Sequence, residues 1–349
     1  MHPSHLRVVR LLLGSLLTLA SFSMMNESAA QTQPPTTAPV VSPEQVRVLE
    51  GHKGSVEALD FTADEKTLVS CSRDHTIKFW DWQTGELLRT LDAHASDVID
   101  VQFSPHGDLI ASCSKDKTIK LWDARTFSLL RTLEGHTDIV RAVAFSPDQK
   151  TMASCGVDKT VRLWDVQSGE LKKTMTGHLG RVKSIVYSPD GKWLASGGDH
   201  TLAQGPEGES IRLWDARTGQ QIGELKGLDN TGIETISLSP DGTLLASSSH
   251  DTFVRIWDLQ TRSTLHKLAG HTEEVDSCSF LPDGKTLVSG CKDKTIKFWD
   301  VKSGQLLKTF TGHTGRVESL CVSPHGKTLI TGGGGGETVI RVWDISKIR

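Results

Sequence analysis

The sequence predicts an all-β fold made of seven copies of a four-stranded antiparallel sheet, and three observations lead to this prediction. A frame that ends in Trp-Asp returns at intervals of 42 to 44 residues, with one interval of 50, and a fixed period of this kind indicates a repeat architecture. Each copy contains short β-branched and apolar runs separated by turn sequences. A segment ahead of the first copy matches the last strand of the others. The closing tryptophans are Trp80, Trp122, Trp164, Trp214, Trp257, Trp299 and Trp343.

The third copy shows the order of strands within one unit. Residues 140–145 form an apolar β-type run, and Ser-Pro-Asp-Gln follows as a turn. A second run covers 151–155, a third covers 161–164, and Ser-Gly turns the chain into a fourth at 170–175. Four strands in each of seven units predict a seven-bladed β-propeller.

The two ends of the repeat region predict how the ring closes. The last copy stops a few residues after Trp343 and leaves no room for a fourth strand. Residues 44–50, EQVRVLE, resemble the fourth strands ELLRTL at 86–91 and QLLKTF at 305–310. We therefore expect the N-terminal strand to complete the last blade, which removes the exposed sheet edges that invite aggregation.

Histidine, serine or threonine, and aspartate recur at fixed places in these copies. Such residues can form catalytic triads, but one active site in every repeat of a small domain is implausible, so we interpret them as a structural device. The histidines are His52, His94, His136, His178, His271 and His313. The hydroxyl residues are Ser70, Ser112, Ser154, Ser196, Ser247, Ser289 and Thr331. The aspartates are Asp74, Asp116, Asp158, Asp251 and Asp293.

The Gly-His…Trp-Asp frame, which covers the chain from about Glu44 to Arg349, resembles the WD40 family. The resemblance implies that the histidine, aspartate, hydroxyl residue and tryptophan of each copy form a hydrogen-bonded tetrad. It also implies a stand-alone, exported, bacterial-type protein that docks a protein or peptide on the top face of the propeller and is not an enzyme. The alternative is an enzyme or small-ligand binder that uses the central channel. The sequence shows no metal-ligand spacing or phosphate loop, so we expect no cofactor.

Function in a near-symmetric scaffold is expected where the copies differ. The fourth copy inserts eight residues in Gly197–Ser210, the fifth places Leu228 and Asp229 where Gly-His is expected, and the seventh offers Glu337 in place of aspartate. Neutral drift of exposed loops is the alternative explanation. By the resemblance, the candidate partner-binding residues at the top opening are Arg73, Lys115, Val157, His250, Lys292, Asp100, Asp229 and Asn230.

The N-terminal region differs from the repeats. Arg7 and Arg10 precede an apolar run at 11–22, and Ser-Ala-Ala ends at Ala30, so residues 1–30 are predicted to be a signal peptide. Residues 31–43 are rich in proline and threonine and are predicted to be a linker before the propeller at 44–349. We therefore expect export and no membrane span in the mature chain.

Bulk composition limits the partners that the chain can recruit. The net charge of −3 gives no support for binding nucleic acid. Three of the six cysteines, Cys71, Cys113 and Cys155, occupy one position in successive copies, so they lie on separate sheets and are predicted to be unpaired. A protein or peptide partner and a monomeric state are the remaining expectations.

Overall fold

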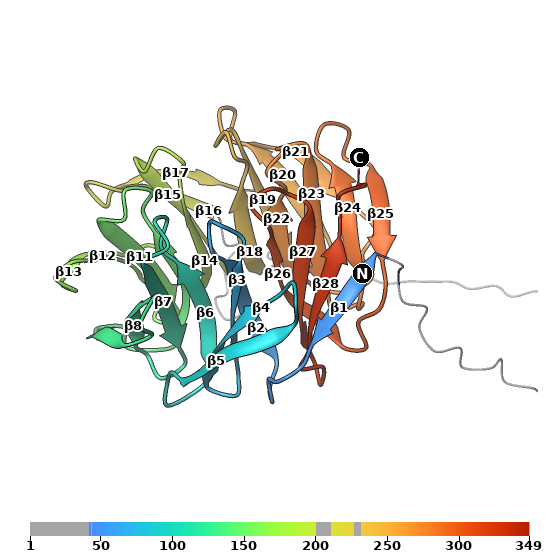
Figure 1. Cartoon of the computed structure of the whole chain (residues 1–349). Coiled ribbons are helices and arrows are strands. Elements are labelled where there is room, and N and C mark those ends of the chain that lie inside the picture. Colours follow the sequence, from blue (N-terminus) through green and yellow to red (C-terminus); the bar gives the residue numbers. More distant parts are fainter. Residues whose placement is uncertain (1–41, 43, 200–210, 227–231, 349) are drawn as a thin grey trace, which may run out of the picture. The chain divides into compact units, whose positions relative to one another are not determined.

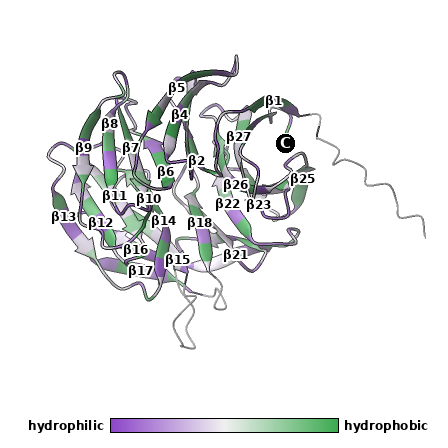
Figure 2. Ribbon diagram, turned by 90° about the horizontal axis from the view of Figure 1, so that it is seen from below, coloured by the Kyte–Doolittle hydropathy of each residue, from purple (hydrophilic) through white to green (hydrophobic). Residues whose placement is uncertain are grey.

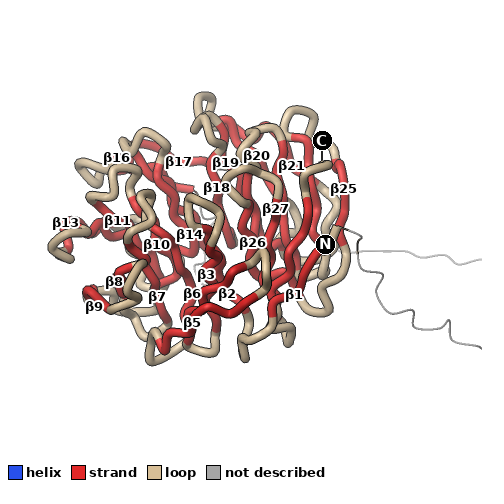
Figure 3. The backbone as a smooth tube through the Cα atoms, viewed as in Figure 1, coloured by secondary structure: helices blue, strands red, loops and turns tan. Residues whose placement is uncertain are grey.

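The computed structural model describes residue 42 and residues 44–199, 211–226 and 232–348. The expected signal peptide, nearly all of the expected linker, Asp229, Asn230 and most of the Gly197–Ser210 insertion lie outside the described residues. Every regular element in the described part of the chain is a β-strand, and the strands form seven four-stranded antiparallel sheets (Figure 3). The all-β, seven-bladed prediction is confirmed.

Each blade has one strand at the channel, two in the middle and one at the periphery. The innermost strands are β2 (Val56–Phe61), β6 (Val98–Phe103), β10 (Val140–Phe145), β14 (Arg181–Tyr187), β18 (Ile233–Leu238), β22 (Val275–Phe280) and β26 (Arg316–Val322). The second strands are β3 (Thr67–Ser72), β7 (Leu109–Ser114), β11 (Thr151–Gly156), β15 (Trp193–Asp199), β19 (Leu244–Ser249), β23 (Thr286–Cys291) and β27 (Thr328–Gly334).

The third and fourth strands lead outward from the channel. The third strands are β4 (Thr76–Asp81), β8 (Ile119–Asp123), β12 (Val161–Asp165), β16 (Ile211–Asp215), β20 (Val254–Asp258), β24 (Ile296–Asp300) and β28 (Ile340–Asp344). The outermost strands are β5 (Glu86–Asp92), β9 (Leu129–Leu133), β13 (Leu171–Met175), β17 (Gln221–Leu225), β21 (Ser263–Leu268), β25 (Leu306–Phe310) and β1 (Gln45–Leu49). We number the blades 1 to 7 from β2 to β26.

The ring closes as the sequence predicts. β1 pairs with β28, so the N-terminal strand is the outermost strand of blade 7 (Figure 1). Each innermost strand contacts the innermost strand on either side, and β26 contacts β2. The backbone N–H of Ser42 also donates to the carbonyl of Thr311, which follows the outermost strand of blade 6. Closure therefore rests on pairing between residues from opposite ends of the chain.

The hydrophobic cores lie between blades rather than within them. One cluster, for example, packs Cys113 and Leu121 of blade 2 against Val143, Phe145 and Trp164 of blade 3. The other six clusters likewise combine adjacent blades. Because both faces of a blade are covered, the middle strands are almost completely buried, whereas β5 is almost completely exposed. Figure 2 colours the residues of the blades by their hydropathy, in a view from below. All six cysteines are unpaired, and five of them are buried.

Every innermost strand carries a β-bulge at the same place. The register of β2 against β3 shifts between Val56 and Ala58, and the same shift occurs in the other six blades. A bulge inserts one extra residue and redirects its side chain. The extra residue always follows the first buried valine or isoleucine of the pairing, which places it at one end of the channel.

The glycine run of blade 7 has a packing reason. Gly332, Gly333 and Gly334 belong to β27, so the run is not merely a turn as its composition suggests. A Cβ added at Gly333 would lie only 2.5 Å from the side chain of Glu337. Gly333 therefore makes room for a carboxylate one methylene longer than the aspartate of the other blades.

Candidate functional site

The seven extra residues of the bulges form one ring around the channel, which we call the bulge ring. All seven line a cavity of about 530 Å³ that runs between the innermost strands. Its members are Glu57, Ile99, Arg141, Lys183, Glu234, Asp276 and Glu318 of blades 1 to 7. Six of these seven positions are charged, although their neighbours in the strands are mostly apolar.

The charges of the bulge ring are segregated. Arg141 and Lys183 lie on adjacent blades 3 and 4, and the carboxylates occupy the consecutive blades 5, 6, 7 and 1. The channel therefore has a basic side and a wider acidic side. A cavity of this volume falls within the ordinary range for small-ligand sites.

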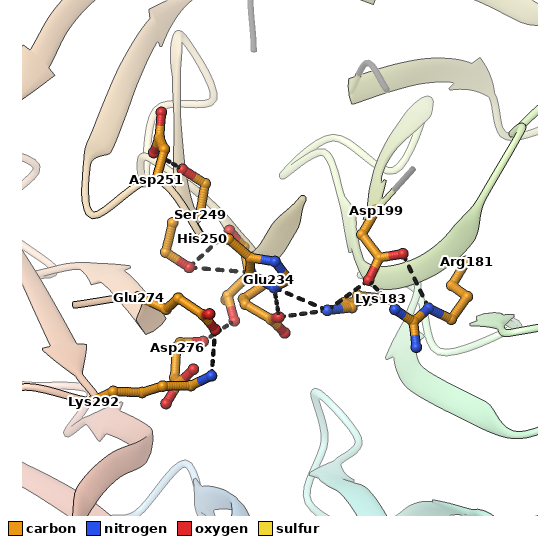
Figure 4. Close-up of polar contacts among 12 residues, drawn as sticks. Arg181, Lys183, Asp199, Glu234, Ser249, His250, Asp251, Glu274, Asp276 and Lys292 are labelled. Carbon is orange, nitrogen blue, oxygen red and sulfur yellow. Dashed lines mark hydrogen bonds and ion pairs between the residues drawn. The ribbon is translucent and has the colours of Figure 1, made fainter. Parts of the chain in front are cut away.

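Four charged members of the bulge ring have partners on the molecule. Lys183 forms ion pairs with Glu234 and, at 2.8 Å, with Asp199, and Asp199 also binds the guanidinium of Arg181 (Figure 4). The ring nitrogen Nε2 of His250 contacts Glu234. This polar network links blades 4 and 5 on one side of the channel.

Glu57 and Glu318, on blades 1 and 7, form ion pairs with arginine side chains. The guanidinium of Arg73 binds Glu57 with an N–O distance of 2.6 Å and lies 3.8 Å from Glu318, which also pairs with Arg316. Burial and the nearby carboxylate of Glu57 raise the pKa of Glu318 to about 7. The side chain of Glu57 is only 4% exposed, whereas that of Arg73 is 44% exposed, so the pair joins a buried carboxylate to a guanidinium at the surface.

Arg141 and Asp276 are the charged members of the bulge ring without partners. Neither side chain forms a hydrogen bond or ion pair with any described residue, and the Nε of Arg141 and the Oδ2 of Asp276 are buried. Burial and the charge of Glu318 raise the pKa of Asp276 to about 8, against the opposite effect of Lys292. Blades 3 and 6 lie on opposite sides of the ring, so the two unpaired charges have opposite signs and face the cavity from opposite walls.

The predicted partner-binding residues lie on the turns between second and third strands, above the bulge ring. The side chains of Arg73 and Lys115 are 44% and 53% exposed, and Lys115 lies 3.8 Å from Asp97. Lys292 is 29% exposed and pairs with Glu274. Val157 and His250 are half-buried on equivalent turns.

Asp100 has a different environment from the one expected for a rim residue. Its carboxylate accepts the backbone N–H of Val101 and, at 2.9 Å, that of Val143 on the next blade. Asp60 makes the equivalent contacts with Phe61 and with Phe103, the latter at 2.7 Å. Both aspartates therefore join adjacent innermost strands. Asp100 lines the channel cavity and does not belong with the exposed rim residues.

The repeated polar side chains form linear hydrogen-bonded chains. In blade 1 the indole N–H of Trp80 donates to Ser70 at 2.8 Å, Ser70 contacts His52 Nε2 at 2.8 Å, and His52 Nδ1 contacts Asp74 at 2.8 Å. The carboxylate of Asp74 can only accept, so Nδ1 carries the proton and Ser70 donates to Nε2. The same chain is complete in blades 2, 3, 6 and 7.

Blades 4, 5 and 7 differ from the others in the hydrogen-bonded chain, at the aspartate or histidine position. Glu337 replaces aspartate in blade 7 and accepts from His313 at 2.7 Å. In blade 5, Trp257 donates to Ser247, while Asp251 binds Arg255 and Ser249. In blade 4, Trp214 and His178 both contact Ser196.

One tetrad also brings together three groups of the kind that ligate metals. Ligand atoms of His271, Cys291 and Asp293 lie within 4.8 Å of one another. Both nitrogens of His271 are already engaged, by Asp293 and Ser289. The thiol of Cys291 accepts the backbone N–H of Asp293, as Ser72 does for Asp74 in blade 1. The cluster thus has the same arrangement as the tetrads of the other blades.

The bulge ring was missed by sequence reasoning, which concentrated on the loops. Its signal is nevertheless present: a charged residue directly after the first buried valine or isoleucine of the innermost strand in six of seven copies. Strict alternation would turn the side chain of that residue toward one face of the sheet. Only the register shift turns it toward the channel. No described residue belongs to a helix that could cross a membrane.

Comparison with known proteins covers the repeats one by one. The model of the family described as "WD domain, G-beta repeat" matches residues 43–81, 85–123, 127–165, 169–203, 219–258, 262–300 and 304–344. Each segment begins at the outermost strand of one blade and continues into the inner strands of the next, and the seven together cover more than half of the chain.

Individual relatives are similar over short stretches. Eukaryotic translation initiation factor 3 subunit I of Culex quinquefasciatus is 41% identical over 64 residues, 18% of this chain and 19% of that protein. Apoptotic protease-activating factor 1 of Mus musculus is 56% identical over 36 residues, 10% of this chain and 3% of that protein. WD repeat and SOCS box-containing protein 1 of Homo sapiens is 38% identical over 80 residues, 22% of this chain and 18% of that protein.

These matches span about a fifth or less of each relative's length, and all three relatives are eukaryotic. They therefore carry no information on export. The seven matched repeats and the closed seven-bladed ring establish that this chain belongs to the WD40 family.

Proposed function

We propose that the protein is a non-enzymatic scaffold that docks a protein or peptide partner on the top face of the propeller. We define this face by the turns that carry Arg73, Lys115, Val157, His250 and Lys292. The observation that supports it is the set of three cations, the exposed Arg73 and Lys115 and the half-buried Lys292, around a channel mouth whose bulge ring is mostly acidic. Charges of both signs at one face favour a partner with a complementary polar surface.

The polar repeats support the absence of catalysis. The histidines of the complete tetrads have both ring nitrogens engaged within their own blades, so no free base faces the channel from these positions. The tetrads act as braces in this proposal, because a chain of satisfied hydrogen bonds stiffens a buried region.

A three-residue variant tests the docking face. Changing Arg73, Lys115 and Lys292 to alanine should abolish capture of the partner that the wild-type protein retrieves from host extract, measured by affinity capture and mass spectrometry. The matched control removes three lysines from turns between first and second strands, at the opposite ends of these strands: Lys66, Lys150 and Lys192. Equal capture by both variants would contradict docking on the top face.

We also infer that the protein is exported and acts as a monomer. The basic start, the apolar run at 11–22 and the Ser-Ala-Ala sequence before Gln31 support export. N-terminal sequencing of the protein from its host should give Gln31 as the first residue. Analytical ultracentrifugation of that material should give the mass of one chain, and a larger mass would contradict the monomer.

A further inference from the structure

The channel is lined by an arginine and an aspartate that the protein itself leaves without partners. Arg141 and Asp276 belong to the bulge ring, line the same cavity and bind no other described side chain. We propose that the channel binds a linear zwitterion, a short peptide with free ends, whose ammonium group meets Asp276 and whose carboxylate meets Arg141.

Arg141 and Asp276 are expected to lower the stability of the protein when they have no partner. A charge removed from water is unfavourable unless it is paired and hydrogen-bonded. Glu57, Lys183, Glu234 and Glu318, the other four charged members, each have an ion-pair partner on the molecule, although the Oε2 of Glu318 also lacks a hydrogen bond. A ligand with both charges would supply the two counter-charges that are still lacking.

A third unpartnered group lies beside the acidic end. Ser277 is only 6% exposed, lines the cavity, and its hydroxyl has no hydrogen-bond partner among the described residues. A hydroxyl can both accept from an ammonium group and donate to a peptide carbonyl. Asp276 and Ser277 are consecutive residues of β22, so one end of the ligand would find a carboxylate and a hydroxyl together.

The surroundings of Asp276 favour a cation from outside. Burial raises its pKa to about 8, with Glu318 and Glu234 adding to the effect and Lys292 and Arg316 opposing it. Of the two cations, Lys292 is paired with Glu274 and Arg316 with Glu318. With this pKa the carboxyl group of Asp276 holds its proton near neutral pH, and an ammonium group at this point would lower the pKa and stabilise the ionised carboxylate.

The positions of the two groups set the length of the ligand. Blades 3 and 6 are separated by at least three steps around a seven-membered ring, so the two charges lie on opposite walls of the channel. The charges of a single amino acid are separated by only a few bonds, so we propose a longer ligand. A peptide lengthens by about 3.3–3.6 Å per residue, so a few residues bring its two ends far enough apart.

Calorimetric titration of the full chain with trialanine tests the proposal. N-acetyl-trialanine lacks the ammonium group and trialaninamide lacks the carboxylate, and each should bind wild-type protein about tenfold or more weakly than trialanine. Asp276→Asn should weaken trialanine by a similar factor but leave N-acetyl-trialanine unchanged. Arg141→Gln should weaken trialanine but leave trialaninamide unchanged.

Glu170→Gln and Arg125→Gln serve as charge-matched controls, because both residues are exposed and lie away from the cavity. These variants should bind trialanine like the wild type. Absence of saturable binding of trialanine at millimolar concentrations would overturn the proposal. Equal affinity for free and blocked peptides would also overturn it, and this comparison needs only the wild-type protein. Loss of partner capture by the rim variant with retained trialanine binding would separate this site from the docking face.

Discussion

At the scale of single residues, one carboxylate in each complete tetrad accepts hydrogen bonds from several donors. Asp116 accepts from His94 Nδ1 at 2.9 Å, from the hydroxyl of Thr118 at 2.6 Å and from the backbone N–H groups of Ala95 and Thr118. Burial acts to raise the pKa of Asp116, but the hydrogen bonds from Thr118 and His94 outweigh it and lower the pKa. Removal of the carboxylate would leave a buried imidazole without its acceptor.

We therefore expect Asp116→Ala to lower the free energy of unfolding by about 1–3 kcal/mol, the usual cost of a stranded buried donor. Urea denaturation followed by tryptophan fluorescence measures this change. Asp92→Ala, at an exposed position of β5, is the control and should stay close to the wild type. A urea midpoint for Asp116→Ala equal to that of the control would contradict the structural role of the tetrad.

The pKa of an aspartate that joins adjacent blades is raised, whereas that of Asp116 is lowered, so we expect such an aspartate to make the stability depend on pH. Burial raises the pKa of Asp60 to about 7, although the N–H groups of Phe103 and Phe61 oppose the increase. The pKa of an aspartate in an unfolded chain is about 3.9. Between these values the folded protein holds a proton that the unfolded chain has lost, so this group's contribution to stability falls as the pH rises.

Asp60→Asn removes this titration. Relative to the variant, the wild type should lose about 2–3 kcal/mol of stability between about pH 5 and pH 8, at up to about 1.4 kcal/mol per pH unit. Urea denaturation of both proteins across this range measures the difference. Parallel pH profiles would show that Asp60 does not titrate in this window.

At the scale of elements, β1 is the strand on which closure depends. Leu49 at its end is 2% exposed and packs with Val56, Trp80 and Ile340. Without β1, this core opens and the edge of β28 lies bare. Removal of a single buried leucine side chain already costs about 2–5 kcal/mol.

A chain that begins at Gly51 should therefore unfold at a lower urea concentration than one that begins at Ser42. A synthetic peptide of residues 42–50 should restore part of the lost stability, because it can pair with β28 in trans. A peptide of the same composition in scrambled order is the control. Equal stability of the two chains, with no response to the peptide, would contradict the role of β1.

At the scale of the whole molecule, the position of the cores determines cooperativity. Each hydrophobic cluster takes its residues from two neighbouring blades, so no blade has a core of its own. A linear repeat array can lose its terminal repeats separately, but a closed ring has no terminal blade.

We expect the propeller to unfold in one transition. The β-sheet signal in circular dichroism and the fluorescence of the tryptophans should change at the same urea concentration, because coincident probes indicate two-state unfolding. A tryptophan transition that precedes the loss of sheet structure would show that individual blades open first.

The sequence by itself determined the repeat, the number of blades and the closing strand. The Gly-His…Trp-Asp frame repeats because each blade has the same polar and packing needs, and residues 44–50 resemble the outer strands because they occupy the same environment. The strand ranges predicted for the third copy differ from β10 to β13 by at most one residue at either end.

Only the tertiary structure decided which side chains meet in the channel. Arg141 and Asp276 are far apart in the chain and look like ordinary alternating strand residues, and the bulge that turns both toward the cavity is a feature of strand pairing. Asp100 was predicted to be a rim residue from its position near the start of a first strand. Its acceptor role could not be predicted, because it depends on the backbone of the next blade. The local sequence pattern reflects the structure of one blade, whereas the channel is formed by contacts among all seven blades.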